Sequence, residues 1–202
     1  MGNSKEEKRK KRKRSLIEWG VILAVILLLY VTGWHTQLLG TLQRGLLATG
    51  LIKPSVPELT QDFPVASMDF YFADKNGTVQ SLEEYRGDVI FINVWATWCP
   101  PCIAEMPSIQ SLYNNMQGVD NVTFLLISMD EEFSRAEEFM ARRNFDLPIY
   151  HYRSRSIEAY PSSVIPTTYV ISPDGRLALE KRGLAKYDTP EFEQFLYDLS
   201  QI

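Results

Sequence analysis

The chemically active part of this sequence is a pair of cysteines, Cys99 and Cys102, the only two in its 202 residues. They follow an apolar stretch typical of a buried strand and precede a helical pattern, so Cys99 lies where a helix begins. There a sulfur meets unpaired N–H groups and the positive end of the helix dipole, which favour the thiolate that attacks disulfides. The spacing predicts thiol–disulfide exchange, with Cys99 as the exposed nucleophile and Cys102 beneath it as the resolving thiol.

A zinc site is the main competing interpretation of this pair, because half of a zinc site has the same cysteine spacing. Such a site needs two more ligands, and the only histidines of the chain are His35 and His151. His35 directly follows a long apolar segment, and His151 belongs to no ligand motif. We therefore expect no metal.

The elements that position the cysteines fit one ordinary core, because 45% of the residues are apolar and 23% are charged. This composition excludes a collagen, a coiled coil and a wholly disordered chain. We predict strands, helices and a leading hairpin that together form an α/β domain with a mixed sheet covered on both faces. The expected hairpin strands are 66–72 and 79–82, the other strands 89–96, 122–128, 167–171 and 176–181, and the helices 102–116, 132–144 and 189–199.

The N-terminus has the pattern of a membrane anchor. Residues 1–14 contain eight lysines and arginines against two glutamates, and the run from Leu16 to Val31 is apolar except for Glu18. A helix from Leu16 to Thr36 would be about 31 Å long at ~1.5 Å per residue, enough to cross a bilayer core. Because basic segments stay in the cytoplasm, we expect the rest of the chain to be exported; we favour this membrane interpretation over nucleic-acid binding. The residues after Val31 form a poor cleavage site, which favours an uncleaved anchor.

The predicted organisation has four parts. These are a basic cytoplasmic head at 1–15, a transmembrane anchor at 16–36, a juxtamembrane segment with a proline-containing linker at 37–56, and a folded domain at 57–202.

The folded part resembles the thioredoxin superfamily and, within it, the membrane-anchored TlpA/ResA-like thiol-disulfide oxidoreductases. The resemblance covers residues 57–202 and rests on Trp98 to Cys102, on Pro107 and on Ile165-Pro166-Thr167-Thr168. It implies a thioredoxin-like fold with an extra N-terminal β-hairpin, and a cis bond before Pro166 beside the cysteine pair. The implied substrate-facing rim consists of Trp98, Pro100, Pro101, Ile165 and Pro166, whereas Trp95 alternates with inward-facing residues and belongs to the core.

Two polar residues refine this resemblance. Thioredoxin carries a buried aspartate six residues before the first cysteine, where this chain has Asn93, whose neutral amide cannot accept a proton. Glu105, three residues after Cys102, matches the acidic residue that TlpA/ResA-like proteins place on the active-site helix. This spacing puts Glu105 on the same helical face as Cys102, where it can assist proton transfer. A solvated surface glutamate is the open alternative.

The resemblance implies a single-pass protein of the bacterial cytoplasmic membrane that reduces disulfides of envelope proteins such as apocytochromes. Its electrons would come from an integral-membrane thiol donor, and no metal or organic cofactor is needed because electrons pass through thiols. A thiol oxidase or isomerase of the same fold stays open. So does a copper-handling protein that uses Cys99, Cys102 and His151.

The two prolines between the cysteines bear on the direction of electron transfer. Pro100 and Pro101 have no N–H, so only the Cys102 and Ile103 amides and the helix dipole are expected to support a Cys99 thiolate. A weakly stabilised Cys99 thiolate makes the dithiol form less stable relative to the disulfide. We therefore predict a reductant, with a reduction potential nearer about −270 mV than about −120 mV.

Overall fold

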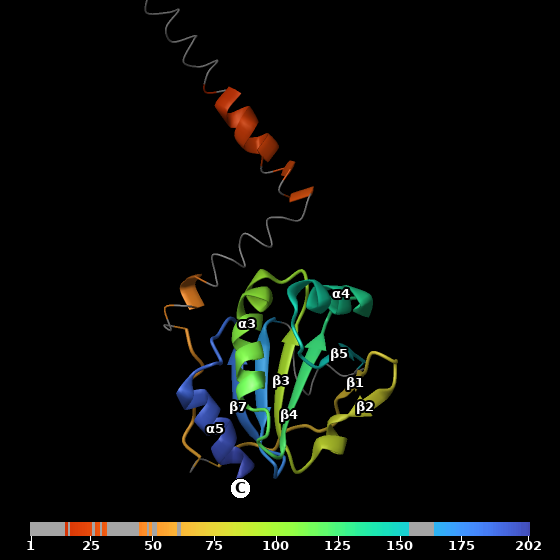
Figure 1. Ribbon diagram of the computed structural model, residues 1–202, viewed down its shortest axis with the longest axis vertical. Coiled ribbons are helices and arrows are strands. Elements are labelled where there is room, and N and C mark those ends of the chain that lie inside the picture. The colour runs from red at the N-terminus through yellow and green to blue at the C-terminus, as the bar shows by residue number, and fades with distance from the viewer. Residues whose placement is uncertain are drawn as a thin grey trace, which may run out of the picture. The chain divides into compact units, whose positions relative to one another are not determined.

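Figure 1 shows the computed structural model, which describes residues 15, 17–25, 27–28, 30–31, 45–47, 49, 52–59, 62–153 and 164–202. The chain divides into two compact units, Met1–Leu39 and Gly40–Ile202. In the first unit the described residues between 15 and 31 are helical. Across the described parts of the chain, no helix has the length and apolar character needed to cross a membrane. Residues 1–14 of the predicted basic head (1–15) and residues 32–36 of the predicted anchor (16–36) lie outside the described residues.

The second unit is built on a mixed sheet, as the sequence predicted. Among the described residues, seven strands pair in the order β2-β1-β5-β4-β3-β6-β7. The parallel pairs are β3 with β4 and β4 with β5, and the other neighbours are antiparallel. The strands are β1 Tyr71–Ala73, β2 Val79–Ser81, β3 Val89–Trp95, β4 Val122–Ser128, β5 Ile149–Tyr152, β6 Thr167–Ile171 and β7 Leu177–Arg182. All seven residues of β3 are buried, which explains why its sequence is almost continuously apolar.

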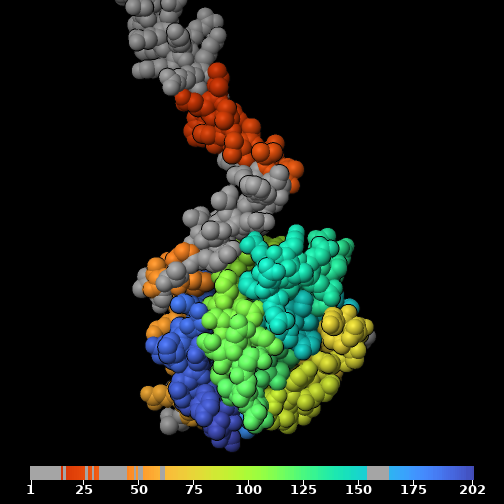
Figure 2. Space-filling view, in the orientation of Figure 1, coloured from red at the N-terminus to blue at the C-terminus, as the bar shows by residue number. Residues whose placement is uncertain are grey.

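Three α-helices pack on one face of this sheet: α3 Pro100–Asn115, α4 Phe133–Arg143 and α5 Pro190–Ser200. The crossovers β3-α3-β4 and β4-α4-β5 proceed in the same direction along the sheet, so right-handed connections put α3 and α4 on the same face. Figure 2 shows the surface of α3 between those of α5 and α4. The core on this face includes Phe91, Ile109, Phe124, Phe139 and Phe192.

The opposite face carries a second buried cluster without an α-helix among the described elements. Phe70 and Leu82, the latter in the short 3-10 helix η1 Leu82–Tyr85, pack against strand residues such as Ile92 and Ile127. Cover on both faces is therefore confirmed, but the predicted cover by helices holds for the first face only, because the second face is covered by the segment around the hairpin.

The N-terminal hairpin is confirmed, but its first strand is shorter than predicted. Residues 66–70 do not belong to β1, because this segment begins beside the other edge of the sheet. Val65 forms a bridge with Arg176, and the Ala66 N–H donates to the carbonyl oxygen of Gly175 at 2.9 Å. From there the chain crosses the second face to pair with β5, and its side chains cover that face.

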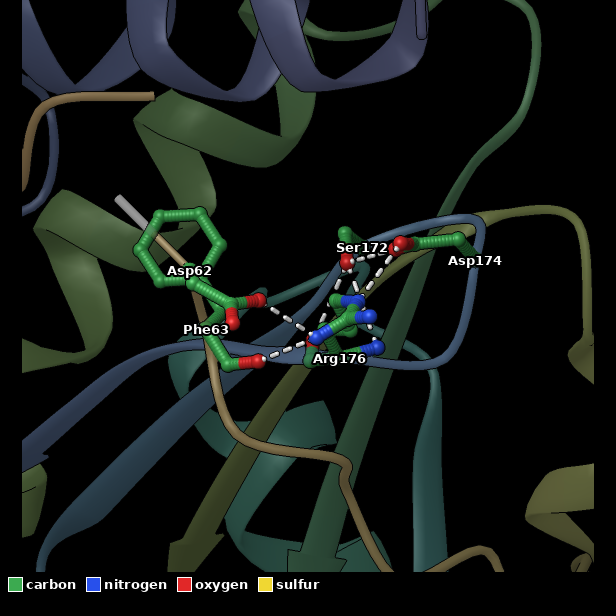
Figure 3. Close-up of polar contacts among 5 residues, drawn as sticks. All are labelled: Asp62, Phe63, Ser172, Asp174 and Arg176. Carbon is green, nitrogen blue, oxygen red and sulfur yellow. Dashed lines mark hydrogen bonds and ion pairs between the residues drawn. The ribbon is translucent and has the colours of Figure 1, made fainter. Parts of the chain in front are cut away.

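Arg176 forms hydrogen bonds to residues 62 and 63, just before the segment that crosses the second face (Figure 3). Its Nη1 donates to Oδ1 of Asp62 and to the carbonyl oxygen of Phe63, both at 2.8 Å. Its Nε donates to Oδ2 of Asp174 at 3.1 Å, and Ser172 completes the turn through its hydroxyl and the Arg176 backbone. The segment before the hairpin is thus tied to the β6–β7 turn.

Most predicted boundaries lie within two residues of the observed ones, and two elements were missed. The active-site helix begins at Pro100 rather than Cys102, because proline is suited to the first helical turn, where its missing N–H costs nothing. Strand β5 and helix η1 were not predicted. Each has only four residues, too few for a hydrophobic period.

Candidate active site

The cysteines lie at the junction of β3 and α3, where Cys99 is the N-cap of the helix. They form a disulfide with an S–S distance of 2.09 Å and a Cα–Cα distance of 5.3 Å. The Cys102 N–H donates to the Sγ atom of Cys99 at 3.3 Å, the bond expected from the third helical residue to an N-cap side chain. Pro100 and Pro101 fill the first two helical positions and have no N–H to donate.

Two expectations about Cys99 are wrong. The first is that it is exposed: only 4% of its surface is accessible, against 0% for Cys102. The loop at Ile165 lies over it, with the Ile165 carbonyl oxygen 3.8 Å from Sγ. The second is that the Ile103 amide supports the sulfur. That N–H instead donates to the Cys99 carbonyl oxygen at 3.1 Å, the regular helical bond between residues four apart.

The predicted rim residues surround this buried disulfide to different extents. Trp98 is exposed over 58% of its surface, whereas Trp95 is fully buried with its ring 5.6 Å from that of Phe139, as predicted for a core residue. Pro100, Pro101 and Ile165 are half-buried. The Ile165–Pro166 bond is cis, as the resemblance implied, and Pro166 is buried.

Glu105 is completely buried, which excludes the alternative of a solvated surface residue. Its Oε1 accepts from Nδ2 of Asn93 at 2.8 Å, and its Oε2 accepts from the Ala185 N–H at 3.3 Å. Desolvation raises the pKa of Glu105 to about 8, against the opposing effects of the Asn93 and Ala185 hydrogen bonds and the charge of Lys181. The carboxyl group is therefore mostly protonated at pH 7 and can exchange a proton near neutrality.

A line of buried polar side chains continues from Glu105 to the strand after the cis-proline. Nδ2 of Asn93 also donates to Oγ1 of Thr168 at 2.9 Å, and the Tyr187 hydroxyl donates to the same Oγ1 at 2.7 Å. Burial raises the pKa of Tyr187 well above its usual value, so it stays neutral. Thr168 and Tyr187 were not predicted as site residues. Thr168 belongs to the proline motif but had no role assigned to it, and Tyr187 belongs to no motif.

A third missed residue, Asp130, holds the loop in front of the disulfide. Its buried carboxylate accepts from the Thr97 N–H at 3.0 Å, from the Thr97 hydroxyl at 2.6 Å and from the Ser128 hydroxyl at 2.9 Å. Thr97 lies two residues before Cys99, so Asp130 fixes the path by which the chain enters the helix. A sequence signal existed, since Ser128 is the last residue of β4, the strand beside β3, and Asp130 follows its carboxyl end.

His151 is not grouped with the cysteines as a metal ligand. It lies in β5, where its ring stacks on Phe133 with the centroids 5.4 Å apart. Desolvation, and then the charge of Arg153, lower its pKa. Within the described ranges, no three His, Cys, Asp or Glu side chains gather as a set that could hold a metal ion. His35 lies outside those ranges.

Known proteins resemble this chain in sequence and in fold. The model of the AhpC/TSA family matches residues 60–179. The thiol-disulfide oxidoreductase ResA of Bacillus subtilis (strain 168) is 28% identical over 169 residues, 83% of this chain and 84% of that protein. The ResA protein of Geobacillus thermodenitrificans is 34% identical over 110 residues, 54% of this chain and 63% of that protein.

Solved structures of other proteins are similar to this chain in fold. A secreted thiol-disulfide isomerase from Corynebacterium glutamicum superimposes with a TM-score of 0.55 and 26% identity, covering 71% of this chain and 91% of that one. A thiol:disulfide interchange protein of the thioredoxin family from Chlorobium tepidum has a TM-score of 0.56 and 22% identity, covering 70% of this chain and 99% of that one.

Proposed function

This chain belongs to the AhpC/TSA family and is a thiol-disulfide oxidoreductase of the thioredoxin fold, and from that premise we propose that it reduces disulfides in other proteins. The reduced Cys99 thiolate attacks one sulfur of a substrate disulfide. A mixed disulfide forms and one substrate thiolate leaves. Because the pKa of Glu105 is about 8, a fraction of this side chain is ionised near neutrality, and Cys102 gives its proton to that ionised form and attacks Sγ of Cys99. The Cys99–Cys102 bond forms, the second substrate thiolate leaves, and two electrons have passed to the substrate.

The observation that supports reduction of substrates, rather than their oxidation, is the small number of hydrogen-bond donors that face the Cys99 sulfur. Among the described residues, the Cys102 amide is the only backbone N–H that donates to it. A capping side chain can also accept from the second helical residue, but that residue is Pro101. The Ile165 carbonyl oxygen presents the negative end of its dipole at 3.8 Å, which disfavours a thiolate. A poorly stabilised thiolate corresponds to a readily oxidised dithiol, and hence to a reductant.

We further propose that the protein is exported and tethered to the bacterial cytoplasmic membrane by residues 16–36, with its N-terminus inside. Support comes from the basic residues of 1–14 and the apolar run after them. The proposed electron donor is an integral-membrane thiol protein, and the proposed substrates are envelope proteins such as apocytochromes. No metal or organic cofactor takes part in the reaction, since both electrons move between sulfur atoms.

The decisive measurement is the reduction potential of the cysteine pair in the full-length protein. After equilibration in glutathione or dithiothreitol buffers, we expect a value near about −270 mV; a potential above about −170 mV would favour the oxidase or isomerase. Metal analysis of the reduced protein addresses the copper-handling alternative, which stoichiometric copper would favour.

Two proline variants test the physical reason for that potential. Pro101→Ala restores an N–H at the second helical position, which can donate to Cys99 Sγ. One such charge-assisted bond, worth ~1.5–3 kcal/mol, raises the potential by about 30–60 mV. Pro100→Ala is the matched control, because the first helical N–H is not a capping donor. Equal shifts in both variants would contradict the capping argument.

A further inference from the structure

Four buried side chains from four parts of the chain form one hydrogen-bonded line behind the disulfide. Glu105 comes from α3, Asn93 from β3, Thr168 from β6 and Tyr187 from the loop before α5. They are all fully buried, and the line runs Glu105 Oε1 to Asn93 Nδ2, Asn93 Nδ2 to Thr168 Oγ1, and Thr168 Oγ1 to the Tyr187 hydroxyl. Any change in the protonation of Glu105 must therefore be accommodated by these neighbours.

The orientation of Asn93 suits only the charged form of Glu105. Its Nδ2 atom uses both hydrogens, one for Glu105 and one for Thr168, while its Oδ1 has no hydrogen-bond partner among the described residues. A carboxylate anion accepts such a bond readily. A protonated Glu105 needs an acceptor for its hydrogen, but Oε1 faces the Asn93 donor and Oε2 faces the Ala185 N–H.

A half-turn of the Asn93 amide resolves this mismatch. The amide nitrogen and oxygen exchange places with almost no change in shape. Oδ1 would then accept from the protonated Glu105 and from the Thr168 hydroxyl, whose oxygen still accepts from Tyr187. Each orientation of the amide thus fits one protonation state of Glu105.

We propose that Asn93 is a positioning residue whose amide turns each time Glu105 takes the proton of Cys102 or returns it. This inference rests on the proposed function, in which the Cys102 thiol loses its proton to Glu105, its sulfur bonds to Cys99 Sγ, and the bond from Cys99 to the substrate sulfur breaks. The turn provides a new acceptor for the transferred proton without water. One group of Asn93 is unpaired in either orientation, Oδ1 in this structure and the NH₂ after the turn, but an Asn93 that could not turn would also leave the transferred proton facing an N–H donor, which opposes the transfer.

The other groups around Glu105 cannot replace Asn93 in this role. Lys181 of β7 acts on Glu105 only through its positive charge, and Ala185 presents an N–H donor. Tyr187 stays neutral, and its hydroxyl is directed to Thr168. Cys102 lies one turn earlier on α3 and supplies the proton. Among these neighbours, Asn93 is the residue that can both donate to the anion and accept from the acid.

The direct test is a pH titration of the Asn93 side-chain NH₂ resonances by NMR, using the oxidised full-length protein in detergent. At high pH we expect shifts typical of an NH₂ that donates to a carboxylate. As pH falls through about 8, the pKa of Glu105, we expect the shifts to move to those of an unbonded NH₂. In Glu105→Gln the NH₂ should stay in the low-pH form throughout. There the Gln amide nitrogen donates to Asn93 Oδ1, and the Gln oxygen accepts from Ala185. An Asn93 NH₂ that keeps its high-pH shifts at every pH would overturn the proposal.

A kinetic test separates this proposal from the role of Glu105 itself. In single turnovers from a preformed mixed disulfide, we expect Asn93→Leu to slow the Cys102 step at least about tenfold and to leave the first attack by Cys99 unchanged. Asn115→Leu is the matched control, because Nδ2 of Asn115 also donates to a glutamate, Oε1 of Glu193 at 2.7 Å, but on the surface. Normal resolution in Asn93→Leu together with slow resolution in Glu105→Gln would overturn the amide turn alone. Normal resolution in both would overturn the proton-transfer mechanism as well.

Discussion

Replacing Glu105 by glutamine should change how stability depends on pH. Its pKa is about 8 in the folded protein, against 4.5 ordinarily, so between these values the folded state holds one proton that the unfolded state has released. Stability therefore falls as pH rises from about 4.5 to about 8, by ~1.36 kcal/mol per pH unit, and is constant above that range. Across this pH range, ionisation of the buried carboxyl group of Glu105 lowers the free energy of unfolding by about 5 kcal/mol in total.

In the Glu105→Gln variant the side chain at this position is uncharged at every pH, so the variant does not lose stability through its ionisation. We expect its free energy of unfolding to match that of the unchanged protein at pH 5 within about 1 kcal/mol, the worth of one hydrogen bond. At pH 8.5 the variant should be more stable by several kcal/mol. The assay is urea unfolding of the oxidised full-length protein at several pH values, followed by circular dichroism.

The difference between the two proteins isolates Glu105, because other titrating groups such as His151 contribute equally to both. Glu193→Gln is the matched control, since Glu193 lies on the surface and should give no such divergence. Stability curves for Glu105→Gln and the unchanged protein that stay parallel from pH 5 to 8.5 would refute the raised pKa of Glu105 and the reasoning from its burial.

Three further predictions concern the cysteines, the loop before them and the membrane topology. Cys102→Ser should accumulate mixed disulfides with substrates in cells, whereas Cys99→Ser should trap none, because attack on the substrate survives only in the first variant. Equal trapping by both variants would contradict the assignment of Cys99 as the nucleophile and Cys102 as the resolving thiol. Asp130→Ala should lower the free energy of unfolding by about 3 kcal/mol, because it leaves buried donors unpaired, and Thr97→Val by about 1 kcal/mol; urea unfolding measures both, and unchanged midpoints would contradict the anchoring role. A reporter enzyme that needs export, fused after Ile202, should be active, and activity of a reporter that works only in the cytoplasm would refute the topology.

The sequence by itself determined the chemistry and the order of the elements, because both are local properties. The spacing of Cys99 and Cys102 at a helix start needs only a few consecutive residues to be recognised. The apolar runs of β3 and β4 mark strands buried on both faces. The cis bond before Pro166, which the structure contains, was expected from the resemblance of Ile165-Pro166-Thr167-Thr168 to the thioredoxin superfamily.

Local patterns were insufficient where short elements or remote segments were involved. Strand β5 was missed because its four residues show no period of their own, and it becomes a strand only by pairing with β4 and β1. The predicted strand 66–72 was too long because the backbone at its start bonds to the β6–β7 turn, more than a hundred positions later in the chain, instead of pairing with β5.

Only the tertiary structure decided the environment of the site. Helical spacing placed Glu105 on the face of Cys102, but it could not show that all five residues from Cys102 to Met106 are buried. That burial arises because the sheet covers one side of the helix and the segment around Ala185 and Tyr187 covers another. The same holds for Cys99, which is closed over by Ile165, a residue 66 positions later in the chain. Burial and pKa depend on which distant segments exclude water from a side chain, and that is fixed only when the chain has folded.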